Sequence, residues 1–196
     1  MKAIGLWRRL RVLIYAATAL GGAATLAGVV LFYMVLKDLP RLPEPLSRII
    51  ETPATEIYAA NGERLLTFGG RQFVPLHRVS TRFIQAILAT EDHRFWDHSG
   101  VDKLRTLKAL WVTFFEPGRV QGASTITQQL AKNLFFSFEQ TWSRKFREPI
   151  VALQIEAQFT KEEILEAYIN QIPFGVGAYG IERAAERFFA KPASGL

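Results

Sequence analysis

The residues best suited to chemistry lie in the segment EDHRFWDHSG, residues 91–100. It opens with two adjacent carboxylates, Glu91 and Asp92, and it also holds two histidines and two aromatic residues. A positioned carboxylate can accept a proton from a substrate hydroxyl group. The histidines are not spaced as in the zinc-binding His-Glu-x-x-His motif. The alternative is a charged, solvated helix end, and we expect the preceding helix to finish at Gly100.

A second segment, QGASTITQQLAKNL at residues 121–134, predicts a helix with one polar face. Residues four apart share a helix face, which pairs Gln128 with Lys132 and Gln129 with Asn133. Hydroxyl side chains and free backbone N–H groups at the start of the helix favour an anion. This face therefore suits a sugar or phosphate ligand. The alternative is an ordinary amphipathic helix, because its first turn carries a capping-box pattern.

A third segment, RKFRE at residues 144–148, places cations around one carboxylate. On a helix, Arg144 and Lys145 both come within reach of Glu148, and such a cluster is suited to a diphosphate. The alternative is a pair of surface salt bridges worth about 0.3–0.5 kcal/mol each. Pro149 follows directly, and proline is unexpected inside a helix because it displaces the preceding residue from the α region.

The N-terminal part of the chain carries the net charge and a long apolar run. Five of the 24 basic residues precede position 38, where there is no acidic residue, and the rest of the chain is nearly neutral. This distribution argues against a nucleic-acid binder. Residues 12–36 are uncharged and long enough to cross a bilayer, and the preceding arginines predict a cytoplasmic N-terminus. A cleaved signal peptide is the alternative, but its apolar region is normally shorter.

The remaining segments predict a linker, a small β element and then helices. Prolines mark residues 37–54 as an extended linker. Asn61-Gly62 between two apolar runs predicts a hairpin, and the β element has two or three strands, the last at residues 73–76. Helices are expected from Thr81 onward, at residues 104–115, 125–134, 141–159, 160–170 and 180–189. The absence of cysteine excludes disulfides, thiolate metal sites and cysteine nucleophiles.

Together these segments resemble the glycosyltransferase domain of class A penicillin-binding proteins and of monofunctional peptidoglycan glycosyltransferases. Residues 91–100 match that family's Glu-Asp-x-x-Phe-x-x-His-x-Gly motif, residues 122–133 match Gly-x-Ser-Thr-Ile-x-Gln-Gln-x-x-Lys-Asn, and residues 144–148 match Arg-Lys-x-x-Glu. A fourth motif at residues 161–170 matches except for an isoleucine in place of leucine, and a fifth fits from residue 177 onward. The five motifs follow one another in family order.

The resemblance implies a mainly α, lysozyme-like fold with a small β element, preceded by one transmembrane helix. We expect a basic cytoplasmic tail at residues 1–11, the transmembrane helix at 12–36, the proline-rich linker at 37–54 and the glycosyltransferase domain at 55–196. The chain would then be a single-pass protein of the cytoplasmic membrane with its N-terminus inside and its catalytic domain outside.

The resemblance also implies a reaction, in which lipid II is polymerised into β-1,4 glycan strands with inversion and release of the polyprenyl diphosphate. Glu91 is the implied base. The implied cations that neutralise the leaving diphosphate are Lys132, Arg144 and Lys145. Glu148 is the second catalytic carboxylate, and together with Glu91 it is an expected ligand of Mg²⁺ or Mn²⁺. The other residues expected to bind substrate are Asp92, Phe95, His98, Ser124, Thr125, Gln128, Gln129 and Asn133.

The expected helix at residues 104–115 is apolar and aromatic enough to enter the membrane interface. Its side chains of interest are Leu104, Leu107, Trp111, Phe114 and Phe115, which Phe135, Phe136 and Phe138 would join. The alternative is that these residues belong to the protein core, because core and interface helices share the same periodicity.

The expected partners are lipid II, the growing glycan strand, the membrane, and a transpeptidase domain or other cell-wall synthesis proteins, with no nucleic acid. The family domain continues beyond the point where this chain stops, so we expect a fragment or a shortened gene product. The chain has no Ser-x-x-Lys motif for a transpeptidase site of its own. Two other functions remain open: a non-catalytic protein that binds lipid-linked precursor or cell-wall synthesis partners, and a lytic enzyme of lysozyme-like fold.

Overall fold

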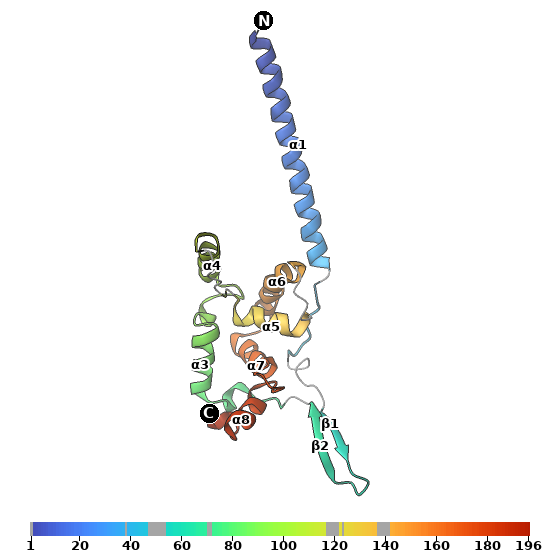
Figure 1. Cartoon of the computed structure of the whole chain (residues 1–196), viewed down its shortest axis with the longest axis vertical. Helices are drawn as coiled ribbons and strands as arrows, with labels where there is room; N and C mark the ends of the chain where they lie inside the picture. The colour runs from blue at the N-terminus through green and yellow to red at the C-terminus, as the bar shows by residue number, and fades with distance from the viewer. Residues whose placement is uncertain are drawn as a thin grey trace. The chain divides into compact units, whose positions relative to one another are not determined.

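The computed structural model describes residues 2–37, 39–46, 54–69, 72–116, 122, 124–136 and 142–196. They form two compact units, Met1–Leu39 and Pro40–Leu196, each of which is considered by itself. Helices dominate both units, and the small β element is a single two-stranded sheet (Figure 1). The prediction of a mainly α protein with a small β element and one apolar N-terminal helix is therefore confirmed.

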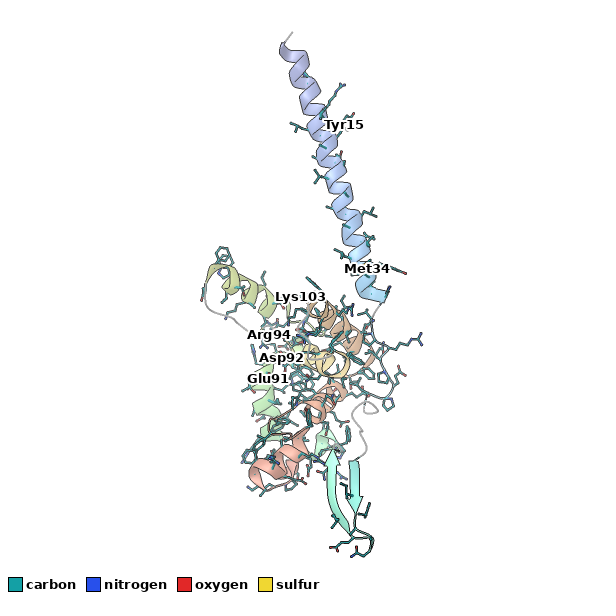
Figure 2. The ribbon with its side chains drawn as sticks, turned by 45° about the vertical axis from the view of Figure 1, so that its right-hand side comes forward. Tyr15, Met34, Glu91, Asp92, Arg94 and Lys103 are labelled. Atoms are coloured by element: carbon teal, nitrogen blue, oxygen red, sulfur yellow. The ribbon has the colours of Figure 1, made fainter. Side chains whose placement is uncertain are left out.

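The first unit is the helix α1, Lys2–Lys37. Its stretch Arg11–Met34 is long and apolar enough to cross a membrane, and none of it is buried against protein. Tyr15 and Met34 mark this stretch in Figure 2, and both side chains are exposed. An apolar helix that packs against no protein needs an apolar surrounding, so its length and composition fit a membrane span.

The β element is an antiparallel hairpin of β1, Ala54–Tyr58, and β2, Arg64–Gly69. Gly62 has a φ of +82°, which glycine adopts without strain, so the predicted turn at Asn61-Gly62 is confirmed. The optional third strand at residues 73–76 is wrong. Val74 pairs instead with the Asn170 side chain, whose amide accepts from the Val74 N–H and donates to its carbonyl, both at 2.9 Å. Leu76 already begins a 3-10 turn.

The second unit contains six α-helices within the described residues. Their bounds are α3 Thr81–Glu91, α4 Lys103–Phe115, α5 Ile126–Phe135, α6 Trp142–Gln158, α7 Lys161–Gln171 and α8 Ile181–Phe189. The unit also has three short 3-10 turns: η1 Leu76–Arg78 before α3, η2 Phe95–Asp97 between α3 and α4, and η3 Ala193–Gly195 after α8. The two predicted capping boxes, at Thr125 and Thr160, are both present and set the first residues of α5 and α7.

The prediction that the first of these helices finishes at Gly100 is wrong. It ends at Glu91, because Asp92 leaves the helical region with φ −158° and ψ 78°. The Asp92 carboxylate then binds the backbone N–H at the start of α5. Residues 92–100 consequently form an irregular loop with one 3-10 turn rather than two more helical turns.

The core of this unit is formed where α5 packs against both α6 and α7. Figure 1 shows these three helices lying together, with α4 at the edge of the unit. The large aliphatic side chains of the three helices that are fully buried are Ile126, Leu130, Val151, Ile155, Ile164, Leu165 and Ile169. Burial of Val151 and Ile155 explains why α6 continues through Pro149, since tertiary packing offsets the lost backbone hydrogen bond.

Candidate active site

Glu91 lies at the last position of α3, where it meets α5. Figure 2 shows Glu91 and Asp92 at this junction. The Glu91 Oε2 atom accepts a hydrogen bond of 2.9 Å from the Gln129 side-chain amide, and its backbone carbonyl accepts one of 2.6 Å from Arg105 Nη1. The structure records no hydrogen bond between Glu91 Oε1 and another described residue. Gln129 therefore holds one carboxylate oxygen and Arg105 holds the backbone of the same residue, while the other carboxylate oxygen stays available.

A tyrosine supports the glutamine that holds Glu91. The Tyr168 hydroxyl donates a hydrogen bond of 3.0 Å to Gln129 Oε1. Tyr168 is 1% exposed, and this burial, together with the charges of Glu91 and Asp92, raises the pKa of its phenol well above the usual range. The phenol consequently keeps its proton and remains a donor at neutral pH.

Asp92 joins the first two motifs from within the protein. Its Oδ2 atom accepts from the backbone N–H of Ile126 and from His98 Nε2, both at 3.0 Å. The carboxylate thus sits at the N-terminus of α5, where the helix dipole favours negative charge. Because Asp92 is 1% exposed, its position favours a role in holding the site together over direct contact with substrate.

The His98 ring adopts the orientation that lets Nε2 donate to Asp92, so the neutral ring carries its proton on Nε2. Its Nδ1 atom is buried without a hydrogen-bond partner among the described residues. Two aromatic contacts complete this loop: the Phe95 ring meets His98 edge-on at 6.3 Å between centroids, and it meets Trp96 at 5.1 Å. Phe95 is fully buried, which again favours a supporting role.

The loop of the first motif closes against α6 at Gly100. Gly100 has a φ of +82°, and a Cβ atom there would lie 2.8 Å from the Ala152 carbonyl oxygen. The Gly100 carbonyl accepts a hydrogen bond of 2.6 Å from the Thr125 hydroxyl. Glycine is therefore required for two reasons, its backbone conformation and the close approach of α6. Thr125 is fully buried and uses its hydroxyl for this contact and for the helix cap.

A second polar cluster lies beneath this loop. Glu156 Oε1 accepts from the Thr127 hydroxyl at 2.6 Å and from Lys161 Nζ at 2.8 Å. The Lys161 ammonium also lies 4.2 Å from the centroid of the Phe95 ring, in cation–π contact. The opening lysine of the fourth motif thus supports the central aromatic residue of the first.

The predicted cation cluster on α6 is present. Arg144 Nε lies 3.1 Å from Glu148 Oε1, and Lys145 Nζ lies 3.2 Å from Glu148 Oε2. Lys145 also donates to the Ser124 hydroxyl at 3.3 Å, so the third motif reaches the start of α5. Glu148 is 3% exposed, whereas the Lys145 side chain is 61% exposed. The carboxylate therefore anchors the cations, and Lys145 is open to an anion from solvent.

Three other predicted residues of α5 have three different roles. Gln128 accepts from the Thr125 N–H to complete the capping box, and the Asn133 carbonyl accepts from the Gln171 side chain at 3.4 Å. Lys132 is half-buried, and its ammonium group has no hydrogen bond or ion pair recorded to any described residue. The sequence therefore predicted one residue that caps the helix, one whose backbone is used, and one cation free for a ligand.

The geometry does not fit the expected metal site. Among the described residues there is no group of three or more acidic or histidine side chains that would hold a metal ion. Both Glu148 oxygens face cations of α6, so a divalent cation there would have to displace Arg144 or Lys145. Mg²⁺ or Mn²⁺ at Glu91 and Glu148 stays a prediction that these contacts do not favour, and no step below uses it.

Three supporting residues were missed from the sequence: Arg105, Tyr168 and Asp102. Tyr168 lies in the fourth motif, which was recognised but given no role. Asp102 caps α4 by accepting from the Arg105 N–H at 3.0 Å, and it is 1% exposed. Burial alone would raise the Asp102 pKa, but that hydrogen bond and the nearby charge of Arg94 outweigh it and lower the pKa below its ordinary value. Cap residues and isolated arginines are common in any sequence. The supporting roles of Asp102 and Arg105 can therefore be recognised only from their contacts in the fold.

Comparison with known proteins points to one family. The family model described as Transglycosylase matches residues 61–196. Penicillin-binding protein 1A of Aquifex aeolicus is 42% identical over 171 residues, which cover 86% of this chain and 23% of that protein. Penicillin-binding protein 1A of Escherichia coli is 44% identical over 138 residues, which cover 69% of this chain and 16% of that protein.

Penicillin-binding protein 2D of Bacillus subtilis is 37% identical over 180 residues, which cover 90% of this chain and 26% of that protein. The chain therefore spans about a quarter or less of the length of these curated relatives. The chain belongs to the transglycosylase family found in penicillin-binding proteins.

Proposed function

We propose that this chain is a peptidoglycan glycosyltransferase that polymerises lipid II into β-1,4 glycan strands. The observation that carries the proposal is the arrangement of a carboxylate and a cation cluster along one helix. Gln129 of α5 holds Glu91, while Ser124, just before the same helix, contacts Lys145. A base and a set of cations for a leaving diphosphate are what transfer from a lipid diphosphate donor requires.

The chemistry assigns each group a step. The free oxygen of Glu91 takes the proton of the acceptor's 4-hydroxyl group. That hydroxyl oxygen forms a bond to the anomeric carbon of the donor from the face opposite the diphosphate, and the bond from this carbon to the diphosphate oxygen breaks. The electron pair leaves with the polyprenyl diphosphate, whose charge is stabilised by Lys132, Arg144 and Lys145. The configuration at the anomeric carbon is inverted, from α to β.

A lytic enzyme is the weaker alternative for this site. Such an enzyme would also use a carboxylate, but its leaving group is a sugar hydroxyl that carries no diphosphate charge. A buried carboxylate that holds two cations beside the start of α5 has no task in that reaction. The cation cluster therefore supports transfer from a diphosphate donor over cleavage of a finished strand.

Membrane attachment fits substrates that are themselves anchored in lipid. α1 has the length and composition of a membrane span. Four large apolar side chains of α4 expose between 62% and 66% of their surface, and they are Leu104, Leu107, Trp111 and Phe115. The alternative prediction that these four residues belong to the core is therefore wrong. Phe114 and Phe138 lie outside the described side chains.

We propose that this face of α4 enters the membrane interface, that α1 anchors the chain, and that the catalytic unit lies outside the cell membrane.

The proposal is tested by incubating the purified chain, in vesicles, with fluorescent lipid II. We expect glycan strands that a muramidase digests, and one released polyprenyl diphosphate for each new glycosidic bond, measured by phosphorus NMR. If the chain binds lipid II but leaves it unchanged, the precursor-binding alternative is correct. If it shortens purified glycan strands and makes none, the lytic alternative is correct.

A further inference from the structure

Two hydrogen bonds, one to Tyr168 and one to Glu91, fix the orientation of the Gln129 side-chain amide. The Tyr168 hydroxyl meets Gln129 Oε1 at 3.0 Å, and Gln129 Nε2 meets Glu91 Oε2 at 2.9 Å. A glutamine amide has one oxygen that accepts and one nitrogen that donates. The two ends of Gln129 therefore face a donor on α7 and an acceptor on α3, and each is satisfied.

The reversed amide would be unfavourable next to an ionised Glu91. Its oxygen would face the carboxylate, which only accepts hydrogen bonds, and two acceptors would then lie against each other. That arrangement becomes favourable only when Glu91 carries a proton, and a protonated carboxyl group cannot act as a base. The direction of the Gln129 amide and the readiness of Glu91 to accept a proton are thus linked.

Tyr168 favours the same direction from the other end of the amide. It is 1% exposed, and the Gln129 oxygen is the one hydrogen-bond acceptor recorded for its hydroxyl in the described part of the chain. A buried hydroxyl without an acceptor is unfavourable, so Tyr168 draws the amide oxygen toward itself and turns the amide nitrogen toward Glu91.

We propose that Tyr168 is a positioning residue that fixes the Gln129 amide and thereby keeps one oxygen of Glu91 hydrogen-bonded and the other available to the acceptor hydroxyl. This inference rests on the proposed function, because it assigns a role to Tyr168 in the reaction of Glu91. Tyr168 touches neither substrate nor the reacting atoms in this account, and it acts through Gln129.

Steady-state kinetics of lipid II polymerisation tests this role with a double-mutant cycle. Tyr168→Phe removes only the hydroxyl, and we expect kcat to fall about tenfold, the equivalent of one lost hydrogen bond, with KM for lipid II within about twofold. Gln129→Met should lower kcat at least as much. Because Tyr168 acts through Gln129, adding Tyr168→Phe to Gln129→Met should cause no further loss. Tyr58→Phe, in the exposed part of the β hairpin, is the matched control and should match the parent chain.

Two kinetic results would overturn the inference. One is an unchanged kcat in Tyr168→Phe. The other is a double variant in which the two losses multiply, since that would mean that Tyr168 supports the fold independently of Gln129. Thermal unfolding of each variant separates these outcomes from a general loss of folded protein.

NMR of the glutamine side chains gives a readout that does not depend on activity. In a chain labelled with ¹⁵N-glutamine, the Gln129 amide pair is identified by its absence from Gln129→Met. We expect this pair to exchange slowly with solvent in the parent chain and faster in Tyr168→Phe. Equal exchange in the two proteins would refute the positioning role even if the chain polymerised nothing, whereas a chain that fails to polymerise but shows the expected exchange would refute only the proposed function.

Discussion

Two helices of the second unit distribute their side chains in opposite ways. At the start of α5 the polar residues Thr125 and Thr127 are fully buried, whereas on α4 the apolar residues Leu107 and Trp111 are 66% and 62% exposed. Neither arrangement is that of an ordinary surface helix, which buries its apolar face and exposes its polar one. The comparison shows that the polar residues at the start of α5 lie in the interior, and that the exposed face of α4 is suited to an apolar neighbour rather than to water.

The buried polar residues are tolerable because each has a partner from another segment. Thr125 binds Gly100, Thr127 binds Glu156, and the N–H of Ile126 binds Asp92. A buried polar group is unfavourable unless it is hydrogen-bonded, so removing one partner affects the other segment as well. The motifs around α5 therefore depend on one another, whereas the exposed apolar side chains of α4 contribute little to the stability of this unit.

The largest effect on stability is expected at the contact between Gly100 and α6. Gly100→Ala adds a Cβ atom 2.8 Å from a backbone oxygen at a φ of +82°. We expect it to lower the free energy of unfolding by about 3 kcal/mol, from left-handed strain together with overpacking. Gly62→Ala is a matched control, because Gly62 has the same φ but nothing within 4 Å of the added atom, and it should cost about 1 kcal/mol.

Urea unfolding of both variants in detergent, followed by tryptophan fluorescence, measures this difference. Equal losses in the two variants would mean that the loop of the first motif does not press against α6.

A smaller loss is expected when the charge of Asp92 is removed. Asp92→Asn keeps the shape of the side chain but weakens the hydrogen bonds from Ile126 and His98 and the interaction with the helix dipole. We expect about 2 kcal/mol lower stability by urea unfolding, within the range for buried charged hydrogen bonds. A variant as stable as the parent chain would show that Asp92 does not join α5 to the first motif.

The pH dependence of stability tests the cap of α4. Because the pKa of Asp102 is lowered in the folded protein, its stabilising effect is complete above the unfolded value of about 3.9 and is lost as the pH falls through the lower folded value. Asp102→Asn keeps a good cap without the charge. We expect it to be less stable than the parent chain by about 1 kcal/mol at pH 7, with the difference shrinking below about pH 4. A difference that is constant with pH would contradict the lowered pKa.

The smallest effect on stability is expected from α4 itself. Leu107→Ser combined with Phe115→Ser changes two exposed side chains, and the free energy of unfolding should move by no more than about 0.5 kcal/mol. Contact with lipid should nevertheless be reduced. The measurement uses a chain in which Trp111 is kept and the other tryptophans are changed to phenylalanine. In vesicles, brominated lipids should quench the fluorescence of Trp111. The quenching should be weaker when the two serine substitutions are added. No quenching of Trp111 in either protein would place α4 in water.

Features set by neighbouring residues could be predicted from the sequence, and those set by distant partners could not. The capping boxes of α5 and α7 and the Asn61-Gly62 turn depend only on residues close together in the sequence. Their patterns therefore predicted the two helix starts and the hairpin correctly. The end of α3 at Glu91 depends on the hydrogen bond between Asp92 and the N–H of Ile126. The absence of a third strand at Val74 depends on its hydrogen bonds with the Asn170 side chain. Both partners lie far along the chain, and no local pattern predicts them.

The candidate site shows the same division. Glu91, Lys145 and Glu148 could be predicted as site residues, because residue type and helical spacing are enough to indicate a base and a cation cluster. The supporting role of Tyr168 required knowing that α7 packs on α5. The exposure of Trp111 was also undecided, because a core helix and an interface helix have the same periodicity.

The most direct test of the central claim compares Glu91→Gln with Glu162→Gln in the polymerisation of lipid II. Glutamine cannot accept the proton of the acceptor hydroxyl, so we expect Glu91→Gln to lower kcat by about 100-fold to 10,000-fold. Its thermal unfolding should remain close to that of the parent chain. Glu162 is exposed on α7, and Glu162→Gln should leave kcat unchanged. If Glu91→Gln is folded and still polymerises lipid II at the parent rate, Glu91 is not the base and the account of the site is wrong.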